Sequence, residues 1–264
     1  MKKTNLILAS LSVLIFSSLA MGQLQLNTGY NNALMAPYPT VTINPSPVGN
    51  RDNYWINIAS YPIAGAPMGP SWVLAKAPPW APAITNTNWI SGRNTWASIL
   101  GIGPSYTIFR KCFCLQRGFK DAKMNFQVRA DDTIQGWLNT QLNQVLPPSW
   151  GNWNGPPLIG GTNNQAYFRP GRNCLYFLVE DFGGHMGFDL EGSVQANGLW
   201  PFAAAGTEAI FSPCPCPTGP AGVPSNANAV FDEQRVVNEI VKLAEARRTA
   251  KQKMRYEGKE PGKE

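Results

Sequence analysis

The sequence has few of the residues that enzymes use for nucleophilic and acid–base chemistry. It contains a single histidine, His185, in a Gly-Gly-His-Met-Gly segment, and no serine lies in a Gly-x-Ser-x-Gly turn. A catalytic triad needs such a nucleophile beside its histidine. Neighbouring acidic residues such as Asp131 and Asp132 point to opposite faces of a regular strand, which does not suit the two carboxylates of a glycosidase. We therefore expect no enzymatic activity and a loop position for His185.

Charged residues are also scarce, at 14% of the 264 residues, and the formal net charge is +6. The basic residues are dispersed except near the C-terminus, so the sequence has no nucleic-acid-binding footprint. Low charge combined with abundant Gly, Pro and aromatic residues is typical of an extracellular all-β protein.

A long apolar run occurs only at the N-terminus. Lys2 and Lys3 precede the apolar residues 6–19, and Ala20 and Gly22 are the small residues that signal peptidase reads. The run is too short for a membrane-spanning helix, and no cysteine follows it that could carry a lipid. We expect residues 1–22 to be a signal peptide and the mature chain to be secreted, periplasmic or on the cell surface, without an integral membrane segment after cleavage.

Residues 106–196 alternate between apolar and polar with a period of two, which predicts β-strands. Segments 170–173 and 182–184, rich in Gly and Asn, separate the strands. We predict an antiparallel β-sandwich over residues 52–210. Its core layer is formed by the apolar side chains that share one face: Phe109, Phe113, Leu115, Phe126, Val128, Leu175, Phe177 and Val179.

The flanking segments differ in composition from the sandwich. Residues 23–51 are expected to be an extended lead-in with one strand candidate at 40–43, residues 211–228 a Pro/Cys-rich linker, and residues 259–264 a disordered tail.

Residues 229–258 are predicted to form a C-terminal α-helix, because Val237, Ile240, Val241 and Ala244 recur at helical spacing. Its expected N-cap is Ser225, Asn226 or Asn228. The helix can pack on the sandwich, remain solvated with its basic end on an anionic surface, or mediate self-association.

The five cysteines are Cys112, Cys114, Cys174, Cys214 and Cys216. Cys112 and Cys114 share one strand face, and Cys174 lies on the non-core face of its strand. A disulfide can join Cys174 to either of the first two, and Cys214 or Cys216 can take the other, which leaves one thiol. Zinc bound by two Cys-x-Cys pairs is the alternative, although such sites usually have wider spacing.

Several short motifs carry a family resemblance. They are an Arg-x-x-Phe-x-Leu strand (residues 110–115), Ala-Asp-Asp at 130–132, the Leu138-Asn139 turn and Gly-x-Asn-x-Leu-x-Phe-x-Val at 171–179. Together they resemble the galactose-binding-domain-like β-sandwich, a jelly roll of secreted bacterial surface proteins and of glycoside hydrolase accessory modules. The resemblance covers roughly residues 52–196 and implies a jelly-roll fold with an accessory, non-catalytic role. Thr140 follows Asn139 where the family usually has Gly.

Asp131 and Asp132 are the candidate metal ligands. Two carboxylates at a strand end, with Thr133 and Asn139 nearby, offer the oxygen ligands that calcium prefers. The pair also resembles the Asp-Asp of calcium-dependent lectin-like sandwiches of another family, although the usual following Gly is absent. Alternatively, both carboxylates only accept hydrogen bonds from turn amides. No other cofactor is expected.

The Trp/Asn/Pro-rich insert at 147–157 is the candidate carbohydrate site. Trp150 and Trp153 can stack on sugar rings, and Asn152 and Asn154 can bond sugar hydroxyls. Alternatively, the two rings cap the sandwich core. The sequence thus favours a protein that binds a glycan or cell-surface polymer, with a matrix protein that self-assembles through its linker and helix as the second hypothesis.

Overall fold

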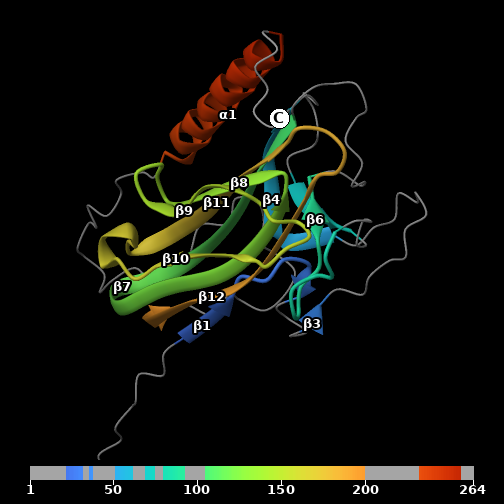
Figure 1. The fold of residues 1–264 in the computed structure, drawn as a ribbon. Coiled ribbons are helices and arrows are strands. Elements are labelled where there is room, and N and C mark those ends of the chain that lie inside the picture. Colours follow the sequence, from blue (N-terminus) through green and yellow to red (C-terminus); the bar gives the residue numbers. More distant parts are fainter. Residues whose placement is uncertain are drawn as a thin grey trace, which may run out of the picture.

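The computed structural model describes residues 22–31, 36–37, 51–61, 69–74, 80–92, 105–199 and 232–256. These ranges contain twelve strands and one α-helix (Figure 1). The strands are β1 (Gly22–Gln25), β2 (Tyr30–Asn31), β3 (Ala36–Pro37), β4 (Arg51–Tyr61), β5 (Gly69–Val73), β6 (Ile90–Ser91), β7 (Ser105–Asp131), β8 (Thr133–Leu138), β9 (Gln144–Trp150), β10 (Leu158–Thr162), β11 (Gly171–Asp181) and β12 (Gly187–Leu199). The helix is α1 (Glu233–Tyr256). All named strand pairs are antiparallel, so the predicted antiparallel β-sandwich with a C-terminal helix is confirmed.

The 27-residue strand β7 belongs to both layers of the sandwich. Its first half pairs with β4 and β11, and its second half pairs with β12 and β10. β8 and β9 extend the first layer beyond β11, whereas β1 lies on the outer side of β12. β7 therefore positions both layers, and its last residues carry the Asp131-Asp132 pair.

The core lies between the two layers. All eight side chains predicted for the core layer are in it, packed around aromatic residues such as Trp55 and Phe188. The rings of Trp55 and Phe188 meet edge to face at 5.2 Å. The period-two alternation therefore identified the buried face of β7 and β11 correctly.

Residues 22–26 are part of the sandwich, which corrects the expectation of an extended lead-in for this described part of 23–51. β1 pairs with β12 from Gly22↔Ala196 to Gln25↔Ser193, and Leu24 and Leu26 enter the core. Its Gln-Leu-Gln-Leu alternation fits a strand, but the segment is short and directly follows the predicted signal peptide. The strand candidate at 40–43 lies outside the described residues.

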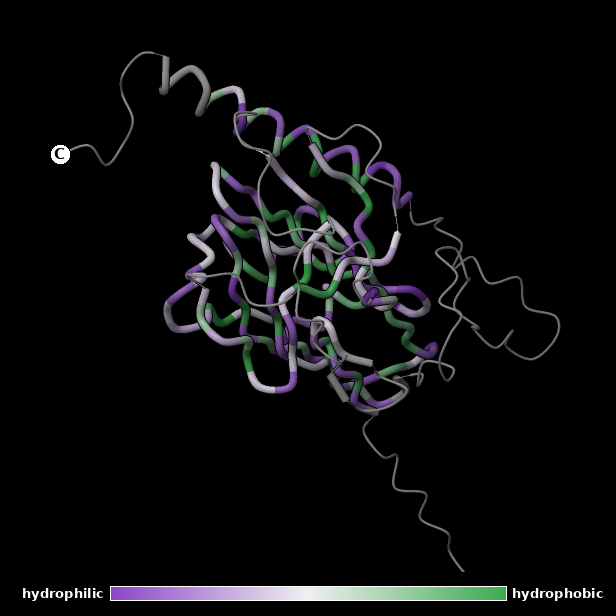
Figure 2. Tube along the Cα trace, turned by 90° about the vertical axis from the view of Figure 1, so that its right-hand side faces the viewer, coloured by the Kyte–Doolittle hydropathy of each residue, from purple (hydrophilic) through white to green (hydrophobic). Residues whose placement is uncertain are grey.

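Helix α1 packs on the outer face of the first layer, as Figures 1 and 2 show. Val236, Ile240 and Ala244 are buried against a second apolar cluster, which includes Ile108, Trp137, Tyr176 and Leu178 of β7, β8 and β11. Figure 2 shows hydrophobic and hydrophilic residues alternating along the helix.

Two details of the predicted helix differ in the structure. Val236 is buried, whereas Val237 and Val241 of the predicted stripe are only partly buried. The cap is Asp232 rather than Ser225, Asn226 or Asn228, since its carboxylate accepts a hydrogen bond from the Arg235 amide at 2.9 Å. The cap therefore lies four residues or more after the expected ones, and the buried face is centred on Val236, Ile240 and Ala244.

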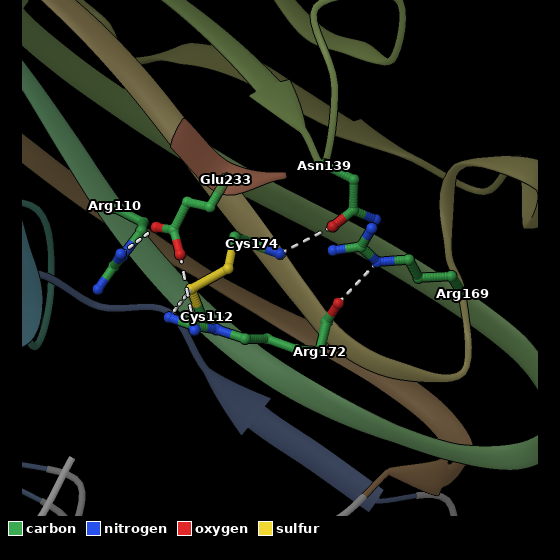
Figure 3. A network of polar contacts seen from close by, with 7 residues as sticks. All are labelled: Arg110, Cys112, Asn139, Arg169, Arg172, Cys174 and Glu233. Atoms are coloured by element: carbon green, nitrogen blue, oxygen red, sulfur yellow. Dashed lines mark hydrogen bonds and ion pairs between the residues drawn. A yellow bond between two sulfur atoms is a disulfide. The ribbon is translucent and has the colours of Figure 1, made fainter. Parts of the chain in front are cut away.

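The disulfide Cys112–Cys174 lies beneath the first turn of α1 (Figure 3). It joins directly opposed residues of β7 and β11, on the face opposite the core, as the strand alternation predicted. This disulfide contradicts the zinc alternative, because a disulfide-bonded Cys112 has no thiolate to bind zinc. Cys114 is also disulfide-bonded; Cys214 and Cys216 lie outside the described residues.

Glu233 fastens the start of α1 to the strands beside this disulfide. Its carboxylate contacts Arg110 of β7 and lies 3.6 Å from the Arg172 guanidinium of β11. Arg110 is almost completely buried, so these contacts add specificity to the docking of the apolar face.

Several predicted segments lie outside the described residues: 1–21 of the signal peptide, the linker at 211–228 and the tail at 259–264. In the part of the chain that is described, no helix has both the length and the apolar character needed to cross a membrane.

Candidate ligand-binding site

The two sites predicted from the sequence lie next to each other at one end of the sandwich. The Ala130 amide donates to the Gly151 carbonyl at 2.8 Å, and the Gly151 amide donates to the Asp132 carbonyl at 2.6 Å. A Cβ on Gly151 would lie 2.0 Å from the Ala130 carbonyl oxygen, so this close approach requires glycine. The Trp/Asn loop therefore borders the Asp131-Asp132 pair directly.

Trp80 holds the Asp131 carboxyl group by a hydrogen bond. The indole Nε1–H donates to Asp131 Oδ2 at 2.7 Å, and the Trp80 ring stacks on Trp89 at 4.3 Å. Asp131 is only 7% exposed. Its burial and its hydrogen bond to the Asp132 side chain raise the pKa of Asp131 to about 8. Two acidic groups thus share a small space in which negative charge is costly.

Two hydrogen bonds join Asp132 to the end of β11. Its amide donates to the Glu180 carbonyl at 2.9 Å, and its Oδ2 accepts from the Phe182 amide at 2.6 Å. Asp132 lies between β7 and β8, outside the regular pleat, and its side chain therefore reaches that of Asp131 instead of pointing away from it. Each carboxylate has one oxygen fixed by a protein N–H group.

The two tryptophans of the loop have different environments. Trp150 is 69% exposed, and its ring meets Phe182 edge to face at 6.0 Å. Trp153 is partly buried against the cluster of Trp80 and Trp89, and its carbonyl accepts from the Ala81 amide at 2.9 Å. Of the two rings, that of Trp150 is exposed to solvent, whereas Trp153 packs on the core, the alternative role considered for both.

The two asparagines also differ. Asn152 adopts a left-handed conformation with φ of 58°, and its Nδ2 donates to the Pro156 carbonyl at 2.7 Å, which closes the turn. Asn154 is exposed at the tip of that turn. The predicted set of four residues is therefore divided: Trp150, Asn152 and Asn154 are exposed, with the Asn152 side chain bonded within the turn, whereas Trp153 is partly buried.

Nearby polar residues support the site without adding an obvious ligand group. Asp181 accepts from the Gly183 amide at 2.8 Å and from the Ser105 hydroxyl at 3.2 Å. His185 lies in a loop as expected, edge-on to Trp80 at 6.2 Å. Partial burial lowers the pKa of His185, although the charge of Asp132 acts in the opposite direction.

The two other residues considered as calcium neighbours are used elsewhere. Asn139 lies at the opposite end of β8, where its side chain bonds the Cys174 amide and Asn173 at 2.9 Å each. The Thr133 hydroxyl donates to Glu180 at 3.1 Å. No group of three or more His, Cys, Asp or Glu side chains in the described ranges could hold a metal ion. Asp131 and Asp132 alone therefore offer carboxylate ligands here.

Sequence reasoning missed Trp80 and Phe182 as parts of this site. Trp80 is 51 residues from Asp131 in the chain. No local pattern signals a contact of that separation.

A groove of about 460 Å³ lies elsewhere, between β7, β9 and β10, and is lined by residues such as Met124, Val145 and Ile159. No aromatic ring lines it. It lacks the stacking surface that a sugar ring would use, so the Asp131-Asp132 end is the better candidate.

Comparisons with known proteins give little further guidance. No family model and no curated protein matches the chain. Among solved structures, the crystal structure of the PA14 domain of the MpAFP antifreeze protein is similar, with 16% sequence identity and a TM-score of 0.24 over 40% of this chain and 46% of that chain. The similarity is too slight to assign a family or a function.

Proposed function

We propose that this protein is a non-catalytic binding protein that recognises a glycan or cell-surface polymer at the Asp131-Asp132 end of the sandwich. The observation that carries this proposal is the exposed ring of Trp150 beside two carboxylates that are fixed by backbone and indole N–H groups. An aromatic face suits the C–H face of a sugar ring, and fixed oxygen atoms suit its hydroxyls. The resemblance to accessory modules supports the same role.

Calcium is the proposed cofactor of this site. Asp131 and Asp132 would hold the ion through their oxygen atoms, and it would supply positive charge that sugar hydroxyls can approach. The fit rests on the donor set, since a divalent cation neutralises the repulsion between the buried carboxylate of Asp131 and the partly exposed one of Asp132. The pair supplies only part of the six to eight oxygen ligands that calcium usually takes, so sugar and water oxygens are expected to contribute.

The disulfide Cys112–Cys174 supports a location outside the cytoplasm, because such bonds persist in oxidising compartments. Self-association has less support. The apolar face of α1 packs on its own sheet, and the linker lies outside the described residues.

A glycan array with and without calcium tests the proposal, using the whole chain and the variants Trp150→Ala and Asp132→Asn. We expect binding that needs calcium and falls at least tenfold in both variants, as loss of a stacking ring or a charged ligand predicts. Leu142→Ala is a matched control, because Leu142 is also highly exposed but lies in the turn between β8 and β9. Absence of binding in all conditions would refute the proposed function.

A further inference from the structure

Helix α1 has no part in the proposed function so far, yet its C-terminal half reaches the strands that end at the ligand site. Arg247 extends from α1 to the outer face of the sheet, where Nη1 donates to Glu180 Oε2 at 3.2 Å. Its Nη2 also donates to the Gln135 side chain. Glu180 belongs to β11 and Gln135 to β8, so one guanidinium bridges two neighbouring strands.

Glu180 in turn is bonded to the residues of the site. Its Oε2 accepts from the Thr133 hydroxyl at 3.1 Å, and its carbonyl accepts from the Asp132 amide at 2.9 Å. Two residues further along the chain, the Phe182 amide donates to Asp132 Oδ2. The end of β11 therefore holds the backbone of Asp132 through the Glu180 carbonyl and its carboxylate through the Phe182 amide.

The Glu180 carboxylate depends on Arg247 for its charge balance. Its side chain is 9% exposed, and Arg247 is its only ion-pair partner among the described residues. Without the guanidinium, this carboxylate would keep the Thr133 hydroxyl but lose its cation at a site with little water. Unpaired buried charges are costly, and a strand end can relieve the cost by moving the side chain toward solvent.

We propose that α1 is a positioning element of the ligand site and acts through Arg247, which holds Glu180 and thereby the Asp132 end of β8 and β11. The inference rests on the proposed function for its biological meaning. The physical contact can be tested without any ligand.

The first test is amide hydrogen exchange in the whole chain, read at the Asp132 amide. For Arg247→Gln we expect exchange there to become about tenfold faster, because local opening of the strand end becomes easier. The matched control is Arg235→Gln, which removes another α1 arginine whose acidic partner is Glu239, at 3.9 Å on the same helix, and whose side chain is 69% exposed. The control should leave the rate within about twofold.

A double variant, Arg247→Gln with Glu180→Gln, tests the route. Removing both charges eliminates the unpaired carboxylate, so exchange at Asp132 should return to within about threefold of the unaltered protein. If the double variant exchanges as fast as the single one, the effect does not pass through Glu180 and the inference is wrong. It is equally wrong if Arg247→Gln leaves the Asp132 rate unchanged, or speeds exchange equally throughout the core of β7 and β11, as a purely structural role would.

Calcium-dependent glycan affinity is the functional readout, and we expect it to weaken about tenfold in Arg247→Gln and to recover in the double variant. If the unaltered protein binds no glycan, the proposed function fails, and the exchange rates still decide whether Arg247 positions Asp132.

Discussion

Ile240 is the central side chain of the contact between α1 and the sheet. It is 0% exposed and packs in the cluster that contains Ile108, Trp137 and Leu178. Changing Ile240 to Ala removes three carbon atoms, and about 0.8 kcal/mol per buried CH₂ gives about 2.4 kcal/mol. The cavity that remains adds to this, so we expect the free energy of unfolding to fall by about 2–4 kcal/mol.

Urea unfolding followed by circular dichroism measures this loss. The far-ultraviolet signal at 222 nm reports the helix, and tryptophan fluorescence reports the sandwich. Because α1 packs on the sheet through one face only, we expect the variant to lose the helix contact first, so that the two signals separate at low urea. Lys242→Ala, on the exposed side of the same helix, is the matched control and should change stability by less than about 0.5 kcal/mol. Equal midpoints for the two variants would show that the helix does not bury this face.

Two further predictions concern the core near the site and the pH dependence. Trp153→Ala should lower the free energy of unfolding by about 2 kcal/mol, because Trp153 packs on Trp80 and Trp89. Trp150→Ala should change it by less than about 0.5 kcal/mol, because the Trp150 side chain is exposed. The opposite order in urea unfolding would contradict the different roles assigned to the two residues. Burial raises the pKa of Asp189 from 3.8 to about 6. Between these two values the folded state keeps a proton that the unfolded chain releases, so the free energy of unfolding should fall as the pH rises from about 4 to about 6. Asp189→Asn should reduce that slope, and an unchanged slope in thermal unfolding would count against the assignment.

The sequence predicted those parts of the fold that depend on strand alternation. The core positions Phe109 and Phe177 and the outward-facing Cys112 and Cys174 all follow from which face a residue occupies, and the structure places them accordingly. A local pattern is sufficient here because the period of two is fixed by backbone geometry.

The parts that could not be predicted depend on contacts between distant segments. The Trp80 indole donates a hydrogen bond to Asp131, 51 residues away in the chain, and the Asn27 side chain accepts one from the Gly192 amide, 165 residues away. The sequence offered the Asp131-Asp132 pair and the Trp150 loop as separate sites, and only the bend of the chain at Gly151 joins them. Likewise, the buried face of α1 follows from where the sheet presents Trp137 and Tyr176, which helical spacing alone does not specify.

The pairing of β1 with β12 has a consequence for how the protein is made. Gly22 lies opposite Ala196, a separation of 174 residues (196 minus 22). A ribosome adds roughly 5–20 residues per second, so β1 waits on the order of 10–30 s for its partner strand to be synthesised. During that time Leu24 and Leu26, which the finished fold buries, have no β12 to cover them. The first of the described strands to be synthesised is thus among the last to be paired, and its apolar side chains stay uncovered until β12 is complete.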